Sequence, residues 1–140
     1  MAVKSKVIAD AGAIVGALSR SDQHFQRAAP LFRSITKPLY TCEPVISEAL
    51  FLTRKVAGGQ DIVLGLIESG ALKIDFSLAD HIPEIRSLMR KYSTTPMSLA
   101  DACLVKMSEL HDAAIFTFDS DFRIYRRFGR QRISLVGIDG

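Results

Sequence analysis

The fold is decided first by one stretch near the N-terminus, VIADAGAIVGAL at residues 7–18. Its first three residues are apolar and end at Asp10, which is typical of a short buried strand. Residues 11–18 then predict a helix. A buried strand that runs directly into a helix is characteristic of α/β proteins, in which parallel strands alternate with helices.

The same order of strand and helix repeats along the chain. The predicted strands are residues 7–9, 39–41, 72–76, 113–118 and 133–136, and the predicted helices are residues 11–18, 22–32, 44–56, 61–68, 80–92 and 98–110. This alternation predicts a three-layer α/β/α sandwich around a parallel sheet. In such sheets, functional sites lie at the carboxyl ends of the strands. In the helix 80–92, the spacing of Ile82, Ile85 and Met89 predicts that these three side chains face inward.

Bulk composition limits the class of protein. A length of 140 residues, 48% of them hydrophobic, fits a single domain spanning residues 1–140 with one core. The net charge of +3 permits an anionic partner such as nucleic acid without requiring one. Cys42 and Cys103 show no metal-binding spacing, so we expect buried free thiols in a reducing cytoplasm. No apolar run approaches the roughly 20 residues of a membrane span, and we expect no membrane association.

Several carboxylates lie where a solvated surface charge is not expected. Asp10 ends the first predicted strand, and Asp119 directly follows the apolar strand AAIFTF, with Asp121 two residues later. Each has a simpler explanation, because Asp10 could cap the helix 11–18 and the sequence DSD favours a turn. The position after a strand nevertheless places all three at the functional edge of the sheet.

Two further acids lie on predicted helices. Glu48 shares an apolar stripe with Val45, Leu52 and Val56, which predicts that its carboxylate faces inward. A buried carboxylate needs a partner, and no basic residue of the same helix lies at a spacing that faces it. Asp101 follows Ser98 by three residues, the spacing of a helix capping box, so a structural cap explains it equally well.

The acids are more informative as a set. If the sheet brings Asp10, Glu48, Asp101 and Asp119 together, their like charges repel unless a cation neutralises them. Oxygen-only ligands favour a hard divalent ion, Mg²⁺ or Mn²⁺. A carboxylate-held ion is suited to phosphodiester hydrolysis. The sequence therefore predicts a metal-dependent phosphodiesterase site.

Four stretches of the chain resemble the PIN domain and, within that family, the VapC-type toxins of prokaryotic toxin–antitoxin systems. The stretches are VIADAGAIVGAL with Asp10, SEALFL with Glu48, SLADACLVKMSE with Asp101, and IFTFDSDF with Asp119 and Asp121. Their order and spacing agree with the family over essentially the whole chain. Ala11 departs from the pattern, because many members carry Ser or Thr there.

The resemblance implies a function and a set of partners. It implies a Mg²⁺- or Mn²⁺-dependent endoribonuclease, the toxin of a type II toxin–antitoxin pair, with an RNA substrate, a small VapB-type antitoxin and a homodimeric state. The implied catalytic and metal-binding residues are Asp10, Glu48, Asp101 and Asp119, with Asp121 as a further metal ligand. Thr117 matches a small hydroxyl residue that can hydrogen-bond a carboxylate.

Other features leave alternatives open. The basic segment with Arg123, Arg126 and Arg127 predicts contact with an RNA backbone, although antitoxin docking or a solvated surface would also explain it. His24 is explained by a polar position at the start of the helix 22–32. A haloacid-dehalogenase-like phosphatase is disfavoured because too few residues follow Asp121. The alternative function is a PIN-like module that binds RNA or protein and has no toxin role.

Overall fold

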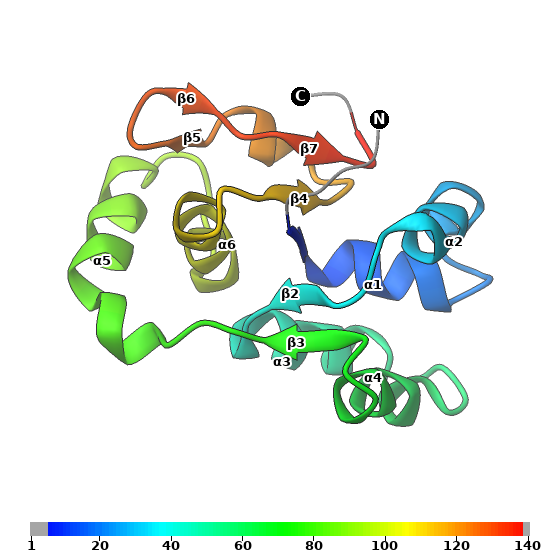
Figure 1. Ribbon diagram of the computed structural model, residues 1–140. Coiled ribbons are helices and arrows are strands. Elements are labelled where there is room, and N and C mark those ends of the chain that lie inside the picture. The colour runs from blue at the N-terminus through cyan, green and yellow to red at the C-terminus, as the bar shows by residue number, and fades with distance from the viewer. Residues whose placement is uncertain (1–5, 139–140) are drawn as a thin grey trace.

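The computed structural model describes residues 6–138, and its centre is a five-stranded sheet in the order β3-β2-β1-β4-β7 (Figure 1). The strands are β1 (Val7–Ala9), β2 (Leu39–Thr41), β3 (Leu72–Ile74), β4 (Ala114–Phe116) and β7 (Leu135–Val136). All four strand pairings in this sheet are parallel. The predicted parallel sheet is confirmed, with strands shorter than expected at residues 72–76, 113–118 and 133–136.

Helices cover both faces of the sheet. They are α1 (Ala11–Leu18), α2 (Phe25–Ser34), α3 (Glu43–Leu52), α4 (Gly59–Glu68), α5 (Ile82–Lys91) and α6 (Leu99–Leu110), with short 3₁₀ helices η1 (Leu78–His81) and η2 (Ser120–Arg123). Figure 1 shows α5 and α6 on one side of the strands and α1 with α2 on the other. The predicted three-layer sandwich is therefore confirmed.

The central strand explains the first stretch of the sequence. Val7, Ile8 and Ala9 are all buried because β1 lies between β2 and β4 and is covered on both faces. A strand in this position reads as a continuous apolar run. The chain adds β2 and β3 on one side of β1, and β4 and β7 on the other. The carboxyl ends of β1 and β4 therefore form the switch point at which ligands bind in parallel sheets.

Two helix predictions need correction. The helix predicted over residues 44–56 ends at Leu52, where the hydroxyl of Thr53 donates to the carbonyl oxygen of Ala49, 2.8 Å away. In α5, Ile85 is buried as predicted, but Ile82 and Met89 are 39% and 37% exposed. Their inward orientation was wrong because the helix turns only one narrow side toward α6.

The basic C-terminal segment forms a small separate element. Strands β5 (Arg126–Arg127) and β6 (Gln131–Arg132) pair antiparallel as a hairpin outside the main sheet. Among residues 6–138, no helix has the length and apolar character needed to cross a lipid bilayer.

Candidate active site

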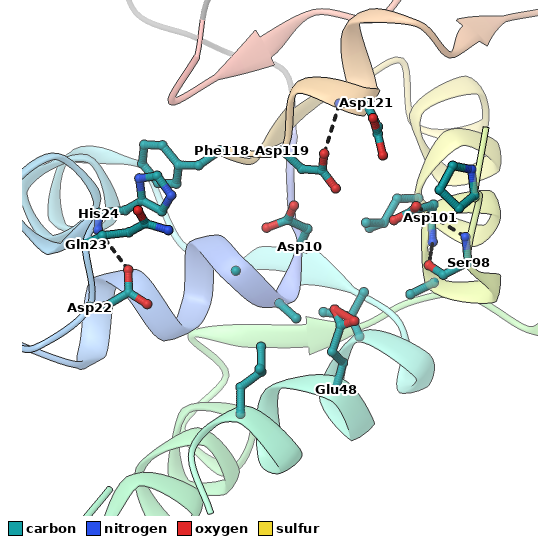
Figure 2. Close-up of a pocket in the computed structure, with 17 residues that line it drawn as sticks. Asp10, Asp22, Gln23, His24, Glu48, Ser98, Asp101, Phe118, Asp119 and Asp121 are labelled. Carbon is teal, nitrogen blue, oxygen red and sulfur yellow. Dashed lines mark hydrogen bonds between the residues drawn. The ribbon is translucent and has the colours of Figure 1, made fainter.

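A cavity of about 460 Å³ opens at the carboxyl ends of β1 and β4. Its lining includes six carboxylates, Asp10, Asp22, Glu48, Asp101, Asp119 and Asp121. The structure thus brings the five acids singled out in the sequence to one cavity and adds Asp22, which lies just before α2. Figure 2 shows Asp10 near the centre, with the carboxylates of Asp119, Asp101 and Glu48 arranged around it.

Asp10 is the most buried of these acids, at 9% exposure. It caps α1, because its Oδ1 accepts a 2.8 Å hydrogen bond from the backbone nitrogen of Ala13. Its Oδ2 accepts a hydrogen bond from the hydroxyl of Thr117. Burial, with a smaller contribution from the charges of Asp119 and Asp101, raises the pKa of Asp10 to about 7 against the opposing effect of these two bonds. Asp10 is therefore both a structural cap and a cavity residue.

The loop after β4 is held by a chain of hydrogen bonds. The hydroxyl oxygen of Thr117 accepts from the backbone nitrogen of Asp119 at 3.0 Å, and Oδ1 of Asp119 accepts from the backbone nitrogen of Asp121 at 2.9 Å. Gly137 lies against this loop with φ +111°, and a Cβ there would be 2.4 Å from the carbonyl oxygen of Thr117. Only glycine fits that position, so the backbone just after β7 can pack closely against the loop.

Asp101 completes a capping box at the start of α6. Its backbone nitrogen donates to Oγ of Ser98 at 3.0 Å, and its Oδ2 accepts from the backbone nitrogen of Ser98 at 3.3 Å. The hydroxyl of the buried Tyr125 also donates to Oδ2, at 3.1 Å. Burial raises the pKa of Asp101 and outweighs these bonds, which lower it. The cap and the cavity position again coexist in one residue.

Tyr125 was missed as a site residue by sequence reasoning. It lies within the basic segment, and its ring is fully buried against Tyr92 and Phe122. Burial and the neighbouring charge of Asp101 raise the pKa of Tyr125. No local sequence signal indicates this contact, because Asp101 lies 24 positions away.

The predicted inward orientation of Glu48 was wrong. Glu48 is exposed, and the stripe it belongs to is covered only at Val45, because Leu52 and Val56 are 45% and 36% exposed. Val45, Glu48 and Leu52 line the cavity, so this side of α3 joins the core at Val45 and forms the cavity wall at Glu48 and Leu52. Partial burial raises the pKa of Glu48, and the charges of Asp101 and Asp119 add to the effect.

The acids are suitable ligands for a divalent cation, but no three of these side chains lie together in a position to bind one. Carboxylate oxygens are the donors that Mg²⁺ and Mn²⁺ prefer, and the charges of Asp101 and Asp119 raise the pKa of neighbouring acids. Within residues 6–138, however, no three acidic, histidine or cysteine side chains form a group that could hold a metal ion as they stand. Direct binding to three of them would require side chains to turn toward one another.

The basic residues predicted to contact RNA lie away from the cavity lining. Nη2 of Arg127 is 2.8 Å from Oδ1 of Asp112, and Nη1 of Arg126 donates to the carbonyl oxygens of the three preceding residues. Arg123 is exposed at the end of η2. None of the three arginines lines the cavity. Their contact with RNA stays a prediction.

The chain belongs to the PIN domain family, because the family profile matches residues 7–127. The predicted family resemblance is confirmed. A comparison with curated protein sequences gave no match.

Two solved structures share the fold. VapC20 of Mycobacterium tuberculosis, described as a toxin that cleaves the sarcin-ricin loop, matches with a TM-score of 0.74 and 15% identity over 83% of this chain and 92% of its own. FitAcB of Neisseria gonorrhoeae matches with a TM-score of 0.54 and 15% identity over 81% of this chain and 88% of its own. At this identity the similarity shows a common fold.

Proposed function

We propose that this chain is a divalent-metal-dependent endoribonuclease that hydrolyses RNA phosphodiester bonds in the cytoplasm, with residues 1–140 forming a single PIN-like nuclease domain. The observation that carries the proposal is the convergence of the acids on one cavity at the switch point of a PIN fold. The proposed catalytic residues are Asp10, Glu48, Asp101 and Asp119, with Asp121 as a further metal ligand.

Some carboxylates around the cavity are held in place by hydrogen bonds, and one can change its orientation. Thr117 and the start of α1 fix the carboxylate of Asp10, and Ser98 with Tyr125 fixes that of Asp101. Glu48 has no hydrogen bond or ion pair to another side chain within residues 6–138, so it can turn to complete a ligand set. These carboxylates would hold Mg²⁺ or Mn²⁺. A bound ion would offset their charge and that of the RNA phosphate, which the acids alone would repel.

We further propose that the chain is the toxin of a type II pair, neutralised by a VapB-type antitoxin and active as a homodimer. The support is membership of the PIN family and the common fold with VapC20. The helical surface is consistent with partners, because Phe51 on α3 and Ile62 and Leu64 on α4 are between 47% and 60% exposed. Large apolar side chains exposed on a helix are available for contact with a partner.

The test is cleavage of a structured RNA by the purified full chain with Mg²⁺, Mn²⁺ or chelator. We expect cleavage with either ion, none with chelator, and strong loss in Asp10→Asn and Asp119→Asn variants. Glu68→Gln, at the exposed end of α4, is the control and should cleave as the wild type does. Absence of cleavage in every condition, with RNA retained in a gel-shift assay, would favour the binding-module alternative.

A further inference from the structure

The cavity has a second wall that the proposed catalytic acids do not form. We call it the aromatic wall, and its residues are Asp22, Gln23, His24 and Phe118. Figure 2 shows these four side chains together, on the side of Asp10 that faces away from Asp101. They come from the start of α2 and from the loop after β4. The metal-dependent chemistry proposed above gives them no role.

Two rings of the aromatic wall form a stack that is already assembled. The ring centroids of His24 and Phe118 are 4.5 Å apart and their planes differ by 6°. His24 is fixed at the start of α2 because its backbone nitrogen donates to Oδ1 of Asp22 at 2.8 Å. The guanidinium of Arg27 lies 5.7 Å from the centroid of Phe118 and supports that ring. Little conformational entropy is therefore lost at these two side chains when a ligand binds.

The stack is only partly covered by the protein. His24 and Phe118 are both half-buried, and both line the cavity. The ring of Phe118 also packs against the core through Phe116, with the two ring centroids 5.9 Å apart, so the stack reaches from the edge of the core to the cavity. The other well-aligned histidine pairs in the described chain, such as His111 with Tyr40 at 5.6 Å, lie outside this cavity. The open surface of the wall is therefore available to a ligand.

The chemistry of the wall fits an uncharged, flat ring with a polar edge. A phosphate is unsuited to it, because the wall contributes the carboxylate side chain of Asp22 and neither lysine nor arginine to the lining. Aromatic side chains stack on nucleobases of every type. The amide of Gln23 can donate and accept at a base edge, and the carboxylate of Asp22 can accept there. The cavity volume of about 460 Å³ lies within the range of about 300–1,000 Å³ that is usual for small-molecule sites.

We propose that the aromatic wall is a nucleobase subsite, which takes one unstacked base of an RNA strand while a neighbouring phosphate lies at the acids. Phe118 directly precedes Asp119, so the stack and one of the acids share a single loop. The place of the base then determines which phosphate reaches the acids. The inference rests on the proposed ribonuclease function and adds to it a means of selecting the bond.

The test measures the binding of a labelled single-stranded RNA and of the same RNA without bases. All proteins carry Asp119→Asn to suppress cleavage and are assayed with Mn²⁺ by fluorescence anisotropy. In the Asp119→Asn protein, we expect removal of the bases to weaken RNA binding strongly. After a further His24→Ala substitution, the weakening on base removal should be about tenfold smaller, because this double variant has already lost the stack. Gln23→Ala, an exposed change with little risk to folding, should show a smaller effect in the same direction.

His111→Ala is the matched control, since it disrupts a histidine stack outside the cavity and should keep the full effect of base removal. Equal losses on base removal in all variants, or no RNA binding at all, would overturn the subsite. The proposed function is judged separately by wild-type cleavage. A wild type that cleaves RNA while the variants show equal losses refutes the subsite alone, and a wild type that never cleaves refutes the nuclease.

Discussion

Asp10 experiences opposing influences that can be separated by experiment. Burial favours its neutral form, whereas the hydrogen bonds from Thr117 and Ala13 favour its carboxylate. Burial wins and raises the pKa to about 7 from an ordinary value of 3.8. Without a cation, the folded protein therefore binds a proton at Asp10 more tightly than the unfolded chain does.

This raised pKa makes metal-free stability depend on pH. The contribution of Asp10 favours folding below about pH 4 and is lost as the pH rises toward about 7. One pKa unit corresponds to about 1.4 kcal/mol, so the full difference is at most on the order of 4 kcal/mol. In chelator, we expect the wild type to lose stability relative to Asp10→Asn over this range, measured by urea unfolding at several pH values. Parallel pH curves for the two proteins would contradict the prediction.

At the scale of the element, α6 shows how one helix end serves two purposes. Its capping box satisfies backbone groups that a helix start otherwise leaves unpaired. Both donors to the Asp101 carboxylate, Ser98 and Tyr125, use Oδ2. Within residues 6–138, Oδ1 is left without such a donor and is the oxygen available to the cavity. The capping box thus orients the carboxylate and still leaves one of its oxygens for the cavity.

Tyr125→Phe tests this orienting role. The change removes the hydroxyl that donates to Asp101, so we expect a loss of about 1 kcal/mol in the free energy of unfolding. The pKa of Asp101 should rise further, because the lost bond lowers it. The measurement is an NMR titration of the Asp101 carboxyl carbon in metal-free protein.

The control is Tyr92→Phe. The ring of Tyr92 packs against Tyr125, and its hydroxyl accepts a hydrogen bond from the backbone nitrogen of Arg126 at 3.0 Å. It should affect stability while leaving the Asp101 titration in place. An unchanged Asp101 titration in Tyr125→Phe would show that the hydroxyl only fills space near the carboxylate.

At the scale of the whole molecule, the features predicted well were those encoded in short-range patterns. The strands at 7–9 and 39–41 and the helix at 11–18 match β1, β2 and α1, because apolar runs and their endings are local properties. The five acids that line the cavity could be singled out because each lies at a strand end, a helix start or an interrupted stripe, and their catalytic role stays a prediction.

Features that depend on distant neighbours were missed or misjudged. The periodicity of α3 indicated an apolar side at Glu48 but not that this side lines an open cavity. The contacts of Tyr125 with Asp101 and of His24 with Phe118 join separate elements, so no spacing rule indicates them. Strand order also had to come from the structure, which alone places the ends of β1 and β4 together.

The convergence of carboxylates leads to a prediction about the whole protein, that a divalent cation stabilises its fold. A ligand that binds only the folded state at about one hundred times its Kd adds roughly 2.7 kcal/mol. We expect Mn²⁺ to raise the melting temperature of the wild type, and to raise it less in Asp10→Asn and Glu48→Gln, because each variant removes one charged oxygen donor. Glu68→Gln lies outside the cavity and should respond as the wild type does. An equal rise in all four proteins would place the bound ion elsewhere, and a smaller rise in Asp10→Asn alone would remove Glu48 from the ligand set.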